Sequence, residues 1–174
     1  MNKFTPILSI LMLLLLSQKS LAQGQLRFSG GLGTNKDITY NFAVDLSFNF
    51  LEESSKFNLG SNIGIYYYDF DEPLLATKDL YFYHLGLHFE YRILERLSVS
   101  TEVGSRNPFN DDNYNFNDPS GNPVPNSDLD SHIYLTPSLD CRINKTLGVF
   151  LFYNVAFEDR LDMNTIGIGV SLNY

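Results

Sequence analysis

Three histidines and one neighbouring serine are the residues of this sequence with the most reactive side chains. His84 and His88 are four residues apart, which separates them by roughly 13 Å along a strand, too far to share one metal ion. Ser131 and His132 point to opposite faces of an extended segment, so they cannot act as a nucleophile and its base. We therefore predict no metal site, no cofactor and no catalytic residue.

A calcium site is the next candidate, in the segment from Asn107 to Asp130, which contains no Lys or Arg. Four of its residues imitate the first ligand positions of an EF-hand loop: Asp111, Asn113, Asn115 and Asn117. Phe116 then replaces the required glycine and Asn122 the bidentate glutamate, so a solvated acidic loop is the favoured interpretation. We regard this loop as a place where an unknown extracellular ligand could bind, with a loose Ca²⁺ or Mg²⁺ contact as the alternative.

Eight charged residues fall within segments of alternating polarity, and all of them lie on the polar side. They are Arg27, Asp45, Glu90, Arg92, Glu102, Arg106, Asp140 and Arg142. The cations are all Arg, whereas every Lys after residue 22 falls in a turn or loop. Because buried charges persist only when they are paired and hydrogen-bonded, the pattern predicts an ionic network inside a narrow barrel. Solvated surface charges are the alternative interpretation.

Eight segments could position these residues, and each alternates apolar and polar side chains with the period of a β-strand. We expect strands at residues 25–33, 38–50, 57–68, 80–92, 97–106, 132–143, 147–157 and 165–174. No helical segment separates them, so strands that follow one another must pair antiparallel. In the sixth strand, Pro137 cannot donate a backbone hydrogen bond, which predicts a bulge or a local irregularity.

A period of two does not distinguish a membrane barrel, apolar outward, from a soluble barrel, apolar inward. Aromatic residues favour the membrane barrel, because they gather at both ends of the expected strands. One group is Phe48, Phe50, Phe57, Phe89, Tyr91 and Tyr174, and the other is Tyr40, Tyr67, Tyr81, Tyr83 and Phe157. Two such rings form the girdles of a bilayer-spanning barrel. Inside it, we expect Gly167 and Gly169 to leave room for Phe150 and Phe152.

The first 22 residues are typical of a signal peptide, and residues 23–174 of a single domain. Lys3 precedes a short apolar core, and Ser20-Leu21-Ala22 supplies small residues for a signal peptidase, so we expect cleavage after Ala22. Loss of Lys3 and Lys19 lowers the basic count from 12 to 10 against 20 acidic residues, which disfavours nucleic-acid binding. The single Cys141 cannot form an internal disulfide and lies on the apolar side of its strand.

The last ten residues alternate apolar and small or polar side chains and end on an aromatic residue. The apolar set is Ile166, Ile168, Val170, Leu172 and Tyr174. This ending resembles the C-terminal signal that bacterial outer-membrane barrels present to the barrel-assembly machinery. The chain as a whole resembles the small eight-stranded barrels of the outer-membrane protein A and X type in Gram-negative bacteria. The resemblance implies an all-β, antiparallel, up-and-down transmembrane β-barrel in the cell outer membrane, in contact with lipid and lipopolysaccharide.

For such a barrel we expect a non-enzymatic role in envelope structure, or at the cell surface through acidic extracellular loops. Eight strands enclose an interior that side chains just fill. A narrow channel for small solutes is the alternative, since interior glycines would admit water whereas Tyr66, Phe82, Phe150 and Phe152 would block it. A lipid-modifying enzyme is the second alternative, because small outer-membrane barrels include lipid A deacylases and palmitoyltransferases.

Overall fold

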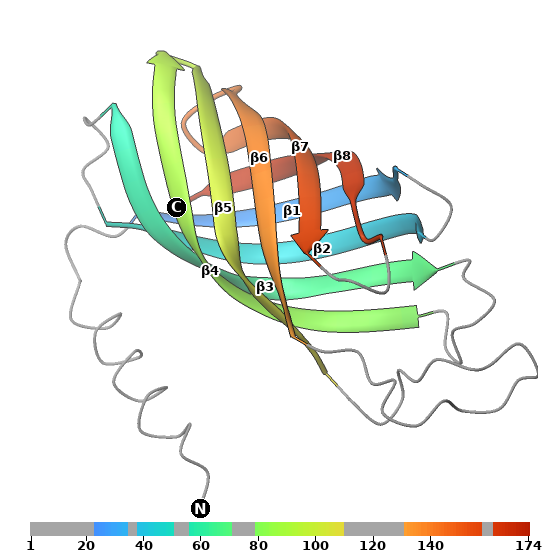
Figure 1. Ribbon diagram of the computed structural model, residues 1–174. Coiled ribbons are helices and arrows are strands. Elements are labelled where there is room, and N and C mark those ends of the chain that lie inside the picture. The colour runs from blue at the N-terminus through green and yellow to red at the C-terminus, as the bar shows by residue number, and fades with distance from the viewer. Residues whose placement is uncertain (1–22, 35–37, 51–55, 71–78, 110–130, 158–161) are drawn as a thin grey trace, which may run out of the picture.

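The alternating segments fold into eight β-strands, which Figure 1 colours in chain order. The computed structural model describes residues 23–34, 38–50, 56–70, 79–109, 131–157 and 162–174. The strands are β1 (Gln23–Gly33), β2 (Ile38–Asn49), β3 (Phe57–Phe70), β4 (Asp79–Leu94), β5 (Leu97–Pro108), β6 (His132–Arg142), β7 (Leu147–Phe157) and β8 (Thr165–Asn173). Across these ranges, no helix is long and apolar enough to cross a membrane.

A closed ring of backbone hydrogen bonds joins the strands. Each strand pairs antiparallel with the next one along the chain, and β1 pairs with β8 from Gln25 opposite Asn173 to Gly33 opposite Thr165. Closure removes the sheet edges, which is the condition for β-structure in a lipid bilayer, where water cannot satisfy free backbone groups. The predicted fold, an eight-stranded, antiparallel, up-and-down barrel, is confirmed.

The strands tilt steeply against the barrel axis. Leu97 of β5 starts a row of paired residues that passes once round the barrel. The row returns to β5 at Asn107, which is ten residues beyond Leu97 (107 − 97). For eight strands this displacement corresponds to a tilt of about 40° and an interior that side chains just fill. Residues distant in sequence therefore meet across the interior.

The outer wall is apolar and the interior is largely polar. On β4 the outward-facing side chains Tyr81, Tyr83, Leu85, Leu87 and Tyr91 are 46–50% exposed. His84 and His88, which alternate with them, are buried. An apolar surface that continues around a whole barrel is far larger than soluble monomers expose, and it suits contact with lipid.

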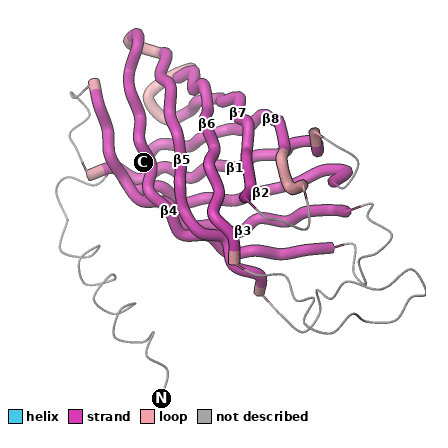
Figure 2. The backbone as a smooth tube through the Cα atoms, viewed as in Figure 1, coloured by secondary structure: helices cyan, strands magenta, loops and turns pink. Residues whose placement is uncertain are grey.

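The two ends of the barrel differ. The turns between β4 and β5 and between β6 and β7 lie at the end that holds the C-terminus, as Figure 2 shows. Two backbone hydrogen bonds connect them there, from Arg142 N to Arg96 O at 2.8 Å and from Asn173 N to Thr146 O at 2.7 Å. We refer to this end as the terminus end and to the opposite one as the far end. β3 and β5 end at the far end, where β4 and β6 begin, and residues 71–78 and 110–130 lie outside the described residues.

Two predicted strand details are wrong. The alternation of the strand predicted at residues 38–50 places Ile38 on the outward apolar side with Tyr40 and Phe42. The pairing of β2 with β3 shifts between Ile38 and Tyr40, however, and turns Ile38 into the interior, where it is buried. Strand ends also differ: β3 continues to Phe70 and β5 to Pro108, whereas Phe50 follows the end of β2. The long loop is therefore shorter than predicted, because Asn107 still pairs with Tyr83.

Pro137 produces an irregularity without a bulge. The pairing of β6 with β7 runs from Leu135 opposite Val155 to Ser138 opposite Phe152, so the register is the same on both sides of the proline. On its other side, Pro137 remains opposite Thr101 of β5. The missing N–H therefore interrupts one ladder locally and leaves the alternation of β6 intact.

Candidate functional site

The interior near the terminus end is organised around Arg27 of β1. Its Nη1 donates to Glu102 Oε1 at 2.5 Å, and its Nη2 donates to Asp140 Oδ1 at 3.2 Å. The guanidinium carbon also lies 3.9 Å from the centre of the Phe150 ring. Since β1 and β5 are not neighbours in the sheet, the Arg27–Glu102 pair crosses the interior. Both side chains are buried, so each depends on the other for its charge to be compensated.

Two histidines extend this network. His88 Nδ1 lies 3.6 Å from Glu102 Oε1, and His84 Nε2 lies 3.0 Å from Asp45 Oδ1. Asn62 connects the two groups, because its Nδ2 donates to Glu102 Oε2 at 3.0 Å and lies 3.4 Å from His84 Nε2. Each histidine thus contacts a carboxylate. Among the described residues, no three His, Cys, Asp or Glu side chains are grouped so that they could hold a metal ion.

Arg106 has a different environment, nearer the far end. Its guanidinium lies between two tyrosine rings, 3.7 Å from the centre of Tyr66 and 4.3 Å from that of Tyr134. Nη1 donates to Tyr68 Oη at 2.5 Å and Nη2 to Asn154 Oδ1 at 2.7 Å. In the described part of the chain, no carboxylate lies within ion-pair distance of this fully buried cation. We refer to Arg106, Tyr66, Tyr68 and Tyr134 as the aromatic clamp, in which π-faces and neutral oxygens hold the charge.

Apolar side chains fill the barrel beyond the aromatic clamp. Buried there with the clamp tyrosines are Ile38, Phe70, Leu80, Phe82 and Met163. Seven strands each contribute a buried inward side chain to the clamp region: Ala43, Tyr66, His84, Arg106, Tyr134, Asn154 and Thr165. The eighth, β1, contributes Gly31, where a Cβ would lie only 2.6 Å from Asn41 Oδ1. Every strand therefore contributes to a section of the interior in which the side chains are buried.

Small residues of β8 make room for aromatic residues of β7, as predicted. A Cβ built on Gly169 would overlap the ring of Phe150, and one built on Gly167 would lie 2.7 Å from Phe152 Cζ. Both phenylalanines are buried. The prediction that these glycines face the interior and accommodate the two rings is confirmed.

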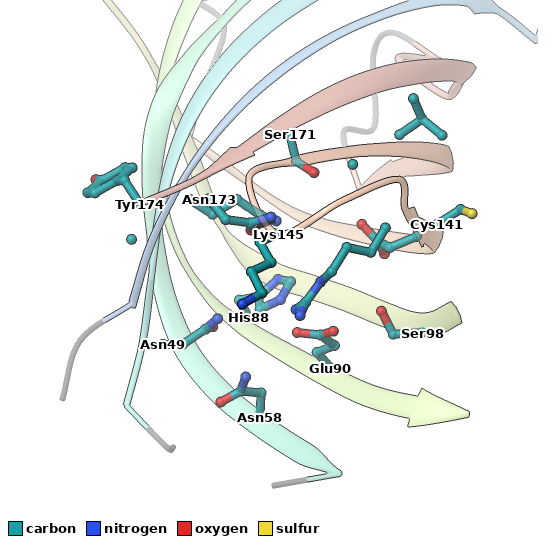
Figure 3. A pocket seen from close by; sticks show the side chains of 16 residues that line it. Asn49, Asn58, His88, Glu90, Ser98, Cys141, Lys145, Ser171, Asn173 and Tyr174 are labelled. Atoms are coloured by element: carbon teal, nitrogen blue, oxygen red, sulfur yellow. Dashed lines mark hydrogen bonds between the residues drawn. The ribbon is translucent and has the colours of Figure 1, made fainter. Parts of the chain in front are cut away.

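The terminus end opens into a polar cavity of about 360 Å³. Figure 3 shows His88 and Glu90 of β4 around it, together with Asn58 of the neighbouring β3, Ser171 of β8 and Lys145 of the turn between β6 and β7. Asp140 also lines the cavity, and its side chain is 19% exposed. Water thus reaches the edge of the Arg27 network from this end, whereas the side chains of the aromatic clamp are buried.

The eight charged residues predicted for the interior take two kinds of position. Five belong to the contacts described above: Arg27, Asp45, Glu102, Arg106 and Asp140. Three lie nearer the terminus end and are half-buried: Glu90, Arg92 and Arg142. Of these, Glu90 and Arg142 line the polar cavity.

Several residues that matter in the interior were not singled out from the sequence. Asn154 accepts a hydrogen bond from Arg106 and donates one to Met163 O at 3.1 Å. Tyr68 and Phe70 fill the far half, and the signal for them was present, because the alternation of β3 continues to Phe70. Asn62 lay on the predicted polar side, but nothing in its position along β3 indicated that it would connect two charged pairs.

The apolar set of the C-terminal strand faces outward. Ile166, Ile168, Val170, Leu172 and Tyr174 are all exposed on the outer wall. Tyr174 N donates to Gly24 O at 3.0 Å and Gly24 N donates to Tyr174 O at 3.2 Å, so the terminal residue lies at the seam between β1 and β8. Its ring covers Gly24 so closely that a Cβ there would overlap it. The role of this set in assembly stays a prediction.

Ser131 and His132 lie on opposite sides of the wall. Ser131 is exposed and its Oγ donates to Asn107 Oδ1 at 2.5 Å, whereas His132 is buried against Phe82, with 5.3 Å between the ring centres. Residues 1–22, for which we predict a signal peptide, and the stretch 111–122, which imitates an EF-hand, lie outside the described residues.

No family model and no curated protein sequence matches the chain. A de novo designed transmembrane β-barrel superposes on it with a TM-score of 0.56 at 12% identity, covering 89% of this chain and 98% of the design. The Yersinia pestis outer membrane protein Ail in a phospholipid bilayer nanodisc gives 0.57 at 13% identity, covering 88% and 99%. A crystal structure of Ail with the heparin analogue sucrose octasulfate gives 0.55 at 12% identity, covering 89% and 100%. At such identities the likeness is one of fold.

Proposed function

We propose that this chain, which has the fold of the small transmembrane β-barrels, resides in the outer membrane as a barrel closed to solutes. Its outer wall supports this location, because exposed Leu, Ile, Val and aromatic side chains surround the barrel. The expected signal peptide would direct export. Folded barrels of this kind migrate faster on gels before boiling than after it, and they need detergent to stay dispersed. A chain that remained monomeric in plain buffer would contradict the proposal.

The aromatic clamp is the observation that carries closure. Arg106 reaches from β5 to Tyr68 of β3 and to Asn154 of β7, so its contacts cross the interior. The residues around it are almost completely inaccessible to water. An ion that passed the clamp would have to displace a buried guanidinium from two rings and two hydrogen bonds. The barrel therefore contributes to the envelope as a structural or surface protein.

Single-channel recording in planar bilayers tests closure. We expect no discrete openings from the wild-type barrel. The double variant Tyr66→Ala and Tyr134→Ala removes the two clamp rings nearest the Arg106 guanidinium and should produce small openings. Tyr81→Ala with Tyr83→Ala is the matched control, because both tyrosines face outward, and it should stay silent. Discrete openings from the wild type would overturn the closed-barrel proposal.

A narrow channel is the second candidate, and the polar cavity is the observation that favours it. The cavity brings water to His88 and Asp140, so half of a pathway already exists from the terminus end. Completing it would require both the Arg27–Glu102 pair and the aromatic clamp to separate. Single-channel recording distinguishes this candidate from the closed barrel directly.

A non-enzymatic role is part of the proposal. In the described part of the chain, the adjacent Ser131 and His132 face opposite sides, which supports it. Mass spectrometry of lipid A with and without expression of the protein should show identical spectra, and a changed acyl pattern would contradict a non-enzymatic role. The barrel-assembly machinery, lipopolysaccharide and a ligand at Asn107 to Asp130 remain proposed partners, and residues 110–130 of that segment lie outside the described residues.

A further inference from the structure

A groove of about 650 Å³ crosses the outer wall from β5 to β2. Two neighbouring rows of outward residues form it, and each row follows the hydrogen-bonding direction across the strands. The lower row is Leu97, Cys141, Val149, Val170 and Phe28, in which each residue is paired with the next. The upper row is Leu139, Leu151, Ile168, Gly30 and Phe42, paired in the same way. The groove is therefore the channel between two rows of side chains.

The groove climbs from the terminus end toward the far end. Leu97 is the first residue of β5, whereas Phe28 lies midway along β1. Four steps between strands cover about 19 Å at the usual spacing of about 4.8 Å. With strands tilted by about 40°, the lower row rises by roughly 12 Å along the barrel axis. That rise is close to the depth of one leaflet, about half of a 30 Å hydrocarbon core.

The lining identifies the occupant as an acyl chain. Apart from Ser29, every residue that lines the groove has an apolar side chain, is glycine, or is Cys141. In the upper row, Gly30 lies between Ile168 and Phe42, and the Phe42 ring packs close to it, since a Cβ on Gly30 would lie 3.2 Å from that ring. A second barrel presents a broad convex wall and would lie across these rows without entering them. A slender apolar chain that runs between the rows can contact both of them along its length.

Cations gather at the end of the barrel where the groove begins. In the described part of the chain, every Lys or Arg that is at least partly exposed lies at the terminus end: Lys56, Arg92, Arg96, Arg142 and Lys145. Arg96 is exposed and directly precedes Leu97, the lowest residue of the groove. Glu95 shares the turn but is one residue further away. A phosphate carried on the chain in the groove would therefore meet Arg96.

We infer that the groove is a binding site for one phospholipid with an anionic head group, from the leaflet at the terminus end. One acyl chain lies between the two rows and the head group lies beside Arg96. This inference rests on the proposed membrane location. It does not depend on whether the barrel conducts ions. Single-channel recording can therefore refute the closed barrel without affecting this inference, and the lipid-binding experiment can refute this inference without affecting the closed barrel.

The absence of Trp from the sequence allows a direct test. Val99→Trp places a fluorophore beside the groove, since Val99 pairs with Leu139. Leu85→Trp places one on β4, away from the groove. Each folded variant is reconstituted in vesicles of equal parts phosphatidylglycerol and phosphatidylcholine. In one sample the phosphatidylglycerol carries brominated acyl chains, which quench Trp fluorescence, and in a second sample the phosphatidylcholine carries them. The bromines lie at the same depth in both samples, so the ratio of the two quenching values reports which lipid is enriched beside the Trp.

We expect brominated phosphatidylglycerol to quench Val99→Trp through a local enrichment of about fivefold, the effect of one cation near an anionic lipid. Leu85→Trp should show no preference. Arg96→Gln should abolish the preference, and Ile168→Phe, which fills the groove, should reduce quenching by both lipids at Val99→Trp. The matched Ile63→Phe on β3 should change neither value. Equal quenching by both lipids at Val99→Trp would overturn the inference. Weak quenching by both lipids at this position would also overturn it, because it would mean that a second copy of the barrel covers the groove and excludes lipid.

Discussion

Breaking the Arg27–Glu102 pair should destabilise the barrel more than any change at the edge of the same network. In Arg27→Met, Glu102 keeps its contacts with Asn62 and His88 but loses its only arginine partner among the described residues. Its side chain is 4% exposed, so water cannot replace that partner. Removal of one member of a buried pair typically costs about 3–5 kcal/mol. Because two polar contacts remain, we expect a loss near 3 kcal/mol.

Asp140→Asn is the matched control. Asp140 contacts the same arginine at 3.2 Å, but its side chain is 19% exposed and borders the polar cavity. The asparagine oxygen can still accept from Arg27, and the buried Arg27–Glu102 pair is retained. Partly solvated ion pairs contribute about 0–1 kcal/mol. The two variants should therefore differ by about 2 kcal/mol, although both remove one charge from the same network.

Urea unfolding in detergent micelles, followed by circular dichroism and by gel mobility without boiling, measures the free energy of unfolding of each variant. The double variant Arg27→Met and Glu102→Gln removes both charges together, so it should cost less than the sum of the single variants. If Arg27→Met proved no less stable than Asp140→Asn, the assignment of the buried pair as the main electrostatic contact would be refuted.

Three further predictions concern the seam and the outer wall. Gly169→Val should lower the free energy of unfolding by about 1–3 kcal/mol, because the valine side chain would overlap the Phe150 ring. Adding Phe150→Leu to this variant should restore part of the lost stability. If it restored none, clashes of the valine with the backbone would be the main cause of the loss. Deletion of Tyr174 should slow the appearance of folded barrel on unboiled gels, whereas Tyr174→Phe should not; equal rates would contradict a role for its ring on Gly24. Cys141 should react in vesicles with apolar maleimides but only slowly with charged thiol reagents, and rapid charged labelling would place it in water.

The sequence predicted the ring of strands and the side of each strand that faces inward, because both follow from local alternation. Arg27, Glu102 and Asp140 were placed in the interior for this reason. Their pairing could not be predicted, because the ten-residue displacement round the barrel decides which residues of the opposite strands β1 and β5 lie at the same height. Equal numbers of Arg and acidic residues also suggested that all charges would pair, whereas Arg106 is held by tyrosines.

Ile38 shows where local pattern fails. Its apolar side chain fits the outward set of β2, and only the shifted pairing with β3 turns it inward. Phe70 was missed for the opposite reason, since the alternation of β3 continues beyond Tyr68, the predicted end of the strand, into residues that resemble a loop in composition. The far half is consequently less polar than the sequence indicated, and Tyr68 of the aromatic clamp contacts Phe70 there.

The Arg27–Glu102 contact also constrains how the barrel enters a membrane. Its two residues are separated by 75 positions and belong to strands that are not neighbours. If strands crossed the bilayer one after another, Arg27 would enter hydrocarbon with β1 long before β5 brought its carboxylate, at a cost of several kcal/mol. A sheet that has already curled, with β1 and β5 facing each other, avoids that intermediate. We therefore expect this chain to insert in a concerted event, in which Arg27 and Glu102 cross the membrane together as a charge-compensated pair.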